Sequence, residues 1–316
     1  MNARSERYKK KKKVRWGRVI FTLFLMMLLV GGIYAYAQYN KGIAEAKNEA
    51  PVKDIAAAKA FKGKQPEKGK INILLLGSDS RGEKHARSDS ILIAQYDQNT
   101  HDSKLVSIMR DSYVNVPGHG KQKINAAIAF GGPELLRQTI KENFDVDINY
   151  YAILDFKGFP KIVDTIAPDG IEVDVPHTMS KNIGVTIPKG IQKLHGKELL
   201  GYVRYRHDSQ SDFGRVGRQQ EVMTKLKNEA TSLNGFLKIP ELLGLTIPYI
   251  DTNLDQNMMV SLGTDVITGQ SKDIQKFRIP EDGTFENRQY AGKGDVLQID
   301  IDKNKEALKN FLDGNS

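Results

Sequence analysis

Apolar and polar residues along this 316-residue chain follow two different periods. Short, mainly apolar runs are typical of buried strands. They predict strands at 71–76, 90–96, 104–109, 151–156, 171–175, 277–279 and 296–301. Stretches in which apolar residues recur every three or four positions predict helices at 125–130, 133–144, 157–166, 196–206, 215–233, 239–249, 258–267 and 303–312. Because strands and helices are interleaved, we expect an α/β fold, with a mixed α+β fold as the alternative, in which helices cover a central sheet.

The N-terminus predicts a membrane anchor. An uncharged apolar run, residues 19–37, follows a basic tail, residues 1–18. A membrane-spanning helix needs about 20 such residues, and positively charged flanks stay in the cytoplasm. A cleaved signal peptide is the alternative, since Ala35-Tyr36-Ala37 resembles a cleavage site. We favour a retained single-pass anchor because the run exceeds the roughly 7–15 apolar residues of a signal peptide. Both interpretations place the rest of the chain outside the cytoplasm.

The charge belongs mainly to the tail. Residues 1–18 hold nine basic residues and one acidic residue, which accounts for +8 of the formal net charge of +9. The rest is nearly neutral, which argues against a basic face for nucleic acid. Residues 38–69 are rich in Ala, Lys and Glu and predict a stalk or linker; a docked first helix is the alternative. Residues 70–316 are long enough to form one domain with a sizeable core.

Cysteine is absent from the chain. Disulfides, thiolate catalysis and cysteine-ligated metals are therefore excluded. The six histidines show no spacing typical of a metal site.

Arginine and aspartate gather in three short patches next to apolar runs. The first joins Gly77-Ser78-Asp79 to Arg87-Ser88-Asp89, the second is Arg110-Asp111, and the third runs from Arg204 to Gln219. Taken alone, each patch is typical of a turn or of exposed ion pairs. Arginine, however, offers a planar fork that matches phosphate oxygens, and aspartates suit Mg²⁺ bound together with phosphate. Because the first two patches follow or begin predicted strands, we expect a shared site for a pyrophosphate.

Spacing within the third patch indicates how its side chains converge. Arg204 and Arg206 would diverge by about 200° on a helix, so they meet better on an extended or terminating segment. Arg215 and Gln219 are four residues apart and share a helix face, with Arg218 near Arg215. A solvated charged helix face is the alternative.

Together these patches resemble the LytR-CpsA-Psr family of Gram-positive envelope enzymes. The motif residues are Leu-Leu-Leu-Gly-Ser-Asp-Ser-Arg (74–81), Arg-Ser-Asp-Ser (87–90), Ser-Ile-Met-Arg-Asp (107–111) with Val-Pro-Gly-His-Gly (116–120), Lys-Ile-Asn-Ala-Ala (123–127), and Tyr-Val-Arg-Tyr-Arg (202–206) to Arg-Gln-Gln (218–220). The resemblance covers about residues 70–235. Met109 departs from it, since the family usually has proline there; we expect a local change at that strand end that leaves Arg110 in place.

The resemblance implies an extracellular domain that transfers a phosphate-linked glycopolymer from an undecaprenyl pyrophosphate carrier to peptidoglycan. Asp79 and Asp89 would hold Mg²⁺, with Mn²⁺ as an alternative. The pyrophosphate would be held by Arg87, Arg110, Arg204, Arg206 and Arg215, supported by Arg218 and Gln219. The catalytic candidates are Arg110, Asp111 and Asp212, of which Asp111 or Asp212 would accept the proton of the attacking sugar hydroxyl. Membrane and glycopolymer, rather than nucleic acid, are the expected partners.

Two other functions stay open on the sequence. A polyprenyl pyrophosphate pyrophosphatase would use the same residues with water as the acceptor. A membrane-anchored transcriptional regulator is the second alternative. The sequence shows no DNA-binding motif, however, and the predicted topology keeps the domain away from DNA.

Overall fold

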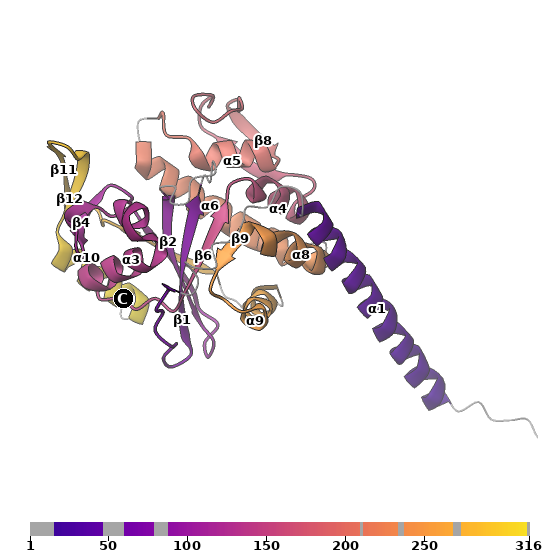
Figure 1. The fold of residues 1–316 in the computed structure, drawn as a ribbon. Helices are drawn as coiled ribbons and strands as arrows, with labels where there is room; N and C mark the ends of the chain where they lie inside the picture. Colours follow the sequence, from indigo (N-terminus) through magenta and orange to yellow (C-terminus); the bar gives the residue numbers. More distant parts are fainter. Residues whose placement is uncertain are drawn as a thin grey trace, which may run out of the picture.

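A six-stranded mixed sheet forms the centre of the molecule (Figure 1). The computed structural model describes residues 16–46, 60–78, 88–208, 211–232, 237–267 and 273–314. The strand order is β10-β3-β2-β1-β6-β9. Their bounds are β1 Lys70–Ser78, β2 Ser88–Asp97, β3 Ser103–Ile108, β6 Tyr150–Asp155, β9 Ile250–Thr252 and β10 Ile274–Ile279. Antiparallel β1–β2 and β2–β3 pairs combine with parallel β1–β6 and β10–β3 pairs, so the fold is a mixed α/β fold.

Two smaller sheets flank the central one. The first has the order β11-β12-β4-β5, and the second pairs β7 with β8. Their bounds are β4 Ser112–Val116, β5 Gly120–Lys123, β7 Ile171–Val175, β8 Gly190–Leu194, β11 Phe285–Tyr290 and β12 Gly294–Ile299. The predicted strands at 171–175 and 296–301 belong here, whereas β4, β5, β8, β9 and β11 were not predicted. Most of these missed strands are short or carry exposed polar residues, so they depend on their partner strands more than on their own apolar pattern.

The helices match most of the predicted ones, with shifted ends. Their bounds are α3 Ala126–Phe144, α4 Gly158–Ile166, α5 Gly196–Arg204, α6 Ser211–Ala230, α8 Ile239–Tyr249, α9 Gln256–Ile267 and α10 Ile301–Asp313. Within α3 the backbone leaves helical geometry at Gly131 and Gly132, which agrees with the two predicted segments that meet at Pro133. α5 ends earlier than predicted and α6 starts earlier, which shortens the loop between them.

The domain has two main apolar cores. Residues of β1, β2, β3 and α3 contribute to the larger core, which includes the fully buried Leu74, Ile93 and Ile140. The smaller core joins α4, α5 and the β7–β8 pair and includes Val173, Leu199 and Tyr202. α6 contributes Val216 to the first core and Val222 to the second. One helix therefore links the central sheet to the α4–α5 layer.

The N-terminal helix α1, Trp16–Ala46, continues beyond the predicted anchor and packs its last turns against α8. In the described part of the chain, no helix meets the length and apolarity expected of a membrane span. Residues within 39–46 and 61–64, both in the predicted stalk, contact the domain. Lys64 donates its amide to Ile148 O at 3.1 Å, and Phe61 is buried in the larger core. Both described ends of the predicted stalk are thus packed on the domain.

Candidate active site

Several strand ends that carry polar residues meet at one edge of the central sheet. The register pairs Gly77 with Ser90, Ile91 with Ile108 and Ser78 with Asp155. The ends of β1, β3 and β6 and the start of β2 therefore lie together, because β1 and β6 are parallel while β2 is antiparallel to both its neighbours. The strand ends next to the first and second patches therefore lie at one edge of the sheet.

The metal candidates lie only partly within the described residues. Asp79 and Arg87 fall outside them, and of Asp89 only the backbone, in β2, is described. The register jumps from the Gly77–Ser90 pair to the Ser78–Ser88 pair, so Asp89 is the extra residue of a β-bulge, a feature that is common beside active sites. Among the residues that the structure describes, no group of three His, Asp or Glu side chains could hold a metal. A Mg²⁺ site at Asp79 and Asp89 therefore stays a prediction, and the backbone register is compatible with it.

α6 lies over this edge and carries part of the third patch. Gln219 donates through Nε2 to Ser90 Oγ at 2.7 Å, and Gln220 donates to Ser107 Oγ at 3.0 Å. Asp212 lies in the first turn of α6, where the helix dipole favours a negative charge. The predicted face with Arg215 and Gln219 thus points toward the strand ends.

The end of α5 brings two arginines to the same place. Arg204 is the last residue of α5, and the next residue, Tyr205, is extended with φ −62° and ψ 139°. Because the backbone is extended at Tyr205, Arg204 and Arg206 can point the same way, as predicted from their spacing. The Arg204 guanidinium lies over the Phe156 ring, 4.9 Å from its centroid.

A pocket of about 430 Å³ opens where these elements meet. Its polar wall combines cations and amides from distant parts of the chain. The residues that line it are Ser90, Phe156, Lys181, Asn182, Val203, Arg204, Arg206, His207, Arg215 and Gln219. Three arginines and one lysine face the pocket, and no Asp or Glu is among these lining residues. The pocket therefore suits an anionic ligand with several oxygens.

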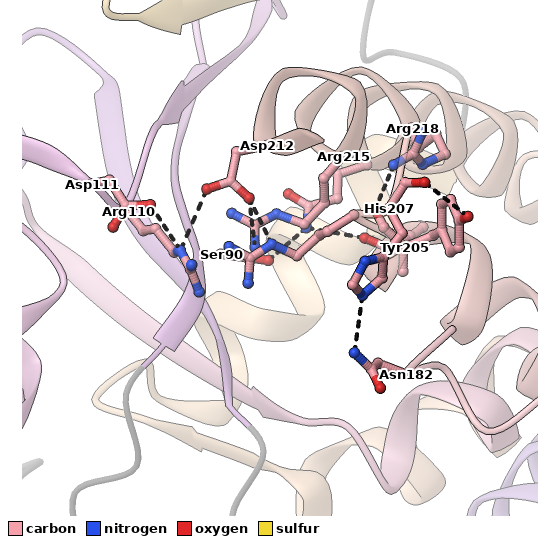
Figure 2. A network of polar contacts seen from close by, with 12 residues as sticks. Ser90, Arg110, Asp111, Asn182, Tyr205, His207, Asp212, Arg215 and Arg218 are labelled. Carbon is pink, nitrogen blue, oxygen red and sulfur yellow. Dashed lines mark hydrogen bonds and ion pairs between the residues drawn. The ribbon is translucent and has the colours of Figure 1, made fainter. Parts of the chain in front are cut away.

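Asp212 joins three arginines that reach it from different elements (Figure 2). Arg206 Nε donates to Asp212 Oδ1 at 2.6 Å, Arg110 Nε lies 3.5 Å from Oδ2, and Arg215 NH1 lies 3.6 Å from Oδ1. Burial raises the pKa of Asp212, but the charges of Arg215, Arg110 and Arg206 and the hydrogen bond from Arg206 lower it further, so the net shift is downward. Asp212 is therefore held as a carboxylate.

Asp111 occupies a similar position at the end of β3. Its Oδ2 accepts from Arg110 Nε at 3.2 Å and its Oδ1 from Lys123 Nζ at 2.7 Å. Arg110 thus lies between two carboxylates, Asp111 and Asp212. Both predicted proton acceptors are bound to cations, and both contact Arg110.

Arg218 does not line the pocket. Its side chain is buried and donates to Tyr202 O at 3.1 Å, to Tyr205 O, and to Asp208 Oδ2 at 2.7 Å. These carbonyls belong to the end of α5 and the residue that follows it. Arg218 therefore holds in place the segment that carries Arg204 and Arg206, and it does not itself reach the pocket.

Sequence reasoning missed part of the pocket wall. Asn182 Nδ2 lies 2.9 Å from His207 Nε2, and both residues line the pocket with Lys181 and Phe156 (Figure 2). Positions 181 and 182 belong to a loop between β7 and β8 that shows no motif. For His207 the one available signal was its place directly after Arg206.

Comparison with known proteins supports the family resemblance that the motifs indicate. The sequence matches the model of the LytR_cpsA_psr family over residues 32–310. Regulatory protein MsrR of Staphylococcus aureus (strain COL) is 42% identical over 281 residues, covering 89% of this chain and 85% of the relative. Polyisoprenyl-teichoic acid–peptidoglycan teichoic acid transferase TagU of Oceanobacillus iheyensis is 34% identical over 280 residues, covering 84% and 85%.

Solved structures are similar over most of their length. TagT bound to LIIa-WTA has a TM-score of 0.63 and 27% identity, covering 85% of this chain and 97% of that one. A second TagT structure, described as a LytR-CPS2A-psr family protein with bound octaprenyl pyrophosphate lipid, has a TM-score of 0.58 and 25% identity, covering 85% and 98%. Motifs, fold and sequence similarity agree, and the chain belongs to the LytR-CpsA-Psr family.

Proposed function

We propose that the protein is a Mg²⁺-dependent phosphotransferase of the cell envelope. It would move an anionic glycopolymer, such as wall teichoic acid, from an undecaprenyl pyrophosphate carrier to a sugar hydroxyl of peptidoglycan. The observation that carries this proposal is the pocket in which Arg204, Arg206 and Arg215 converge. Support comes from the name of the TagU relative and from the ligands bound in the TagT structures.

The pocket's charges suit the bond changes of this reaction. The hydroxyl oxygen bonds to the phosphorus that bears the glycopolymer, and the bond from that phosphorus to the bridging oxygen breaks. Polyprenyl phosphate leaves with the bridging oxygen, and the hydroxyl proton passes to solvent or to a carboxylate. Negative charge grows on the phosphoryl oxygens during transfer, and fixed arginines stabilise it. Because Asp212 already holds Arg206, Arg110 and Arg215, these side chains need little rearrangement when the substrate binds.

A bound Mg²⁺ would neutralise part of the pyrophosphate charge. Asp79 and Asp89 are the residues that would hold it, since carboxylates and phosphate oxygens are the ligands Mg²⁺ prefers. We also propose that the protein is a single-pass membrane protein with its N-terminus in the cytoplasm and its domain outside.

The deciding experiment gives the full-length protein a lipid-linked glycopolymer, Mg²⁺ and peptidoglycan oligomers, and analyses the products by mass spectrometry. A joined glycopolymer–peptidoglycan product that disappears without Mg²⁺ is expected. Release of the glycopolymer phosphate with no joined product would instead identify a pyrophosphatase. No reaction with any acceptor would contradict the transferase proposal and favour a role of the kind that the name of MsrR suggests.

A further inference from the structure

A row of helices joins the N-terminal helix to the pocket. α1 contacts α8, α8 contacts α4, and α4 contacts α5, which ends at Arg204. Figure 1 shows the C-terminal end of α1 against α4 and α8, while the rest of α1 extends away from the domain. Each contact in this row involves a glycine.

The first contact joins α1 to α8 at two glycines. A Cβ on Gly42 would lie 2.2 Å from Glu241 O, and a Cβ on Gly244 would lie 2.1 Å from Tyr39 O. Both neighbours are backbone atoms, so no side-chain movement could make room. Lys41 Nζ donates to Glu241 Oε1 at 2.6 Å beside this crossing, and the Glu241 side chain is only 9% exposed. The two helices are therefore held in backbone contact.

The second contact joins α8 to the start of α4. Tyr249, at the end of α8, packs with Ala46 and Leu245 in a small buried cluster. A Cβ on Gly158 would lie 2.5 Å from Tyr249 Cγ. Gly158 begins α4 two residues after Phe156, whose ring lies against the Arg204 guanidinium in the pocket.

The third contact joins α4 to the start of α5. A Cβ on Gly196 would lie 2.2 Å from Pro160 O, and Gly196 N donates to Asp164 Oδ1 at 2.8 Å. α4 is thus connected to Arg204 in two ways. Phe156, just before α4, contacts the Arg204 side chain, and α4 packs against α5, which ends at Arg204.

We propose that docking of α1 on α8 positions the Phe156–Arg204 wall and so sets the affinity of the pocket for pyrophosphate. Tyr249 is then a positioning residue, because it touches α4 and is not among the residues that line the pocket. Close-packed helices shift as units when a contact between them is forced apart. The choice of pyrophosphate as ligand rests on the proposed function, whereas the mechanical link does not.

Glycine-to-alanine variants of the full-length protein test the link. Gly42→Ala and Gly244→Ala force α1 and α8 apart, and Gly263→Ala is the matched control, since a Cβ at this helical glycine meets nothing within 4 Å. Amide hydrogen exchange reports local opening without any need for a substrate. Both test variants should speed exchange by about tenfold or more in residues 156–159 and 203–206, and the control should not. Unchanged exchange there would overturn the proposal.

Binding of inorganic pyrophosphate, measured by calorimetry on the same variants, tests the consequence. The dissociation constant should rise by about tenfold in Gly42→Ala and Gly244→Ala, which is a modest loss of binding free energy. It should stay unchanged in Gly263→Ala. Faster exchange with an unchanged dissociation constant would refute the effect on affinity. Absence of pyrophosphate binding by the unmodified protein would count against the proposed function, and the exchange data would still decide the mechanical link.

A milder pair of variants covers the case in which the glycine variants fail to fold. Tyr249→Phe keeps the ring against Gly158, and Tyr249 Oη makes no hydrogen bond within the described part of the chain. Tyr249→Leu removes the aromatic ring. Weaker pyrophosphate binding in Tyr249→Leu, with normal binding in Tyr249→Phe, is the expected result. Equal binding in both variants would contradict a positioning role for Tyr249.

Discussion

At the scale of single residues, Asp212 connects parts of the chain that are far apart in sequence. It contacts Arg110 after β3, Arg206 after α5 and Arg215 on α6. Its side chain is 14% exposed, so these interactions are only weakly screened by solvent. A carboxylate in this position sets the arginine geometry before any substrate arrives.

The Asp212→Asn variant should be less stable than the unmodified protein at neutral pH. The folded protein lowers the pKa of Asp212, so the ionised carboxylate contributes stability above its unfolded pKa of about 3.9. This contribution is lost as the pH falls through the folded pKa. Thermal midpoints of the two proteins should therefore differ by a constant amount well above the unfolded pKa, and the difference should shrink as the pH falls below about 4. A difference that grows in acid would contradict this account.

The same variant separates two roles in turnover. An organising role predicts a higher KM for the lipid-linked donor, because the arginines lose their fixed positions. A role as the general base predicts a lower kcat at an unchanged KM.

Arg206→Lys and Arg215→Lys should each lower kcat/KM by about tenfold or more. Lysine keeps the charge but loses the planar fork, and one charge-assisted hydrogen bond is worth about 1.5–3 kcal/mol. The double variant should be less than additive if both side chains hold the same phosphate group. Arg288→Lys is a suitable control, because Arg288 is exposed, pairs with Glu286 and is not among the residues that line the pocket. Normal kinetics in both test variants would show that these arginines do not hold the substrate.

Met109 shows how one residue alters an element. The family usually has proline at this position, and proline has no backbone N–H. Met109 N donates to Ile279 O at 2.8 Å, so methionine extends the contact between β3 and β10 by one hydrogen bond. The expected local change at the strand end is thus an additional bond, with Arg110 still beside Asp111 and Asp212.

At the scale of elements, the α5–α6 corner decides where the arginines point. Arg218 on α6 does not line the pocket. It donates hydrogen bonds to the carbonyls of Tyr202 and Tyr205 and to the carboxylate of Asp208. The corner places Arg204 at the end of α5 and Arg206 just after the extended Tyr205. A helix that continued to residue 206, as the pattern predicted, would have separated the two side chains.

Arg218→Met should lower the free energy of unfolding by about 3–5 kcal/mol, since removing one partner of a buried ion pair leaves the other charge unpaired. The side chains of Arg218 and Asp208 are each 8% exposed. Chemical denaturation measures the change. Arg288→Met removes a half-exposed arginine and should leave the unfolding midpoint almost unchanged. Equal stability of the two variants would show that the corner does not depend on the Arg218 contacts.

At the scale of the whole molecule, α1 links the predicted anchor to the domain. Residues 39–46 pack on α8, whereas residues 24–34 include exposed large apolar side chains such as Met27 and Leu29. If residues 19–37 lie in the membrane, docking at Gly42 holds the pocket at a constant height above it. A carrier lipid in the same membrane would then meet the pocket in one orientation.

A protease added to intact protoplasts should digest residues 70–316, because positively charged flanks keep the N-terminus in the cytoplasm. Immunoblotting against the C-terminus detects the loss. A cytoplasmic protein serves as the control for membrane integrity. Full protection of the C-terminal domain would refute the proposed topology.

Much of the fold and part of the site follow from local patterns. The apolar periods predicted the main strands and helices, because burial of one face, or of a whole strand, determines which neighbouring residues are apolar. The spacing of Arg204 and Arg206 predicted an extended corner, and the spacing of Arg215 and Gln219 predicted a shared face. β5 and β11 could not be predicted in this way, because their exposed polar residues form strands only beside β4 and β12.

The sequence by itself determined the family, the α/β class and which strand and helix ends carry charged residues. Only the tertiary structure decided that Asp212 joins three arginines, that Arg218 turns away from the pocket, and that Asn182 meets His207. It also decided that the end of α1 packs on α8 through Gly42 and Gly244. The physical reason is that periodicity records how each segment is buried, whereas contacts between distant segments depend on how closely their backbones can approach once they pack together.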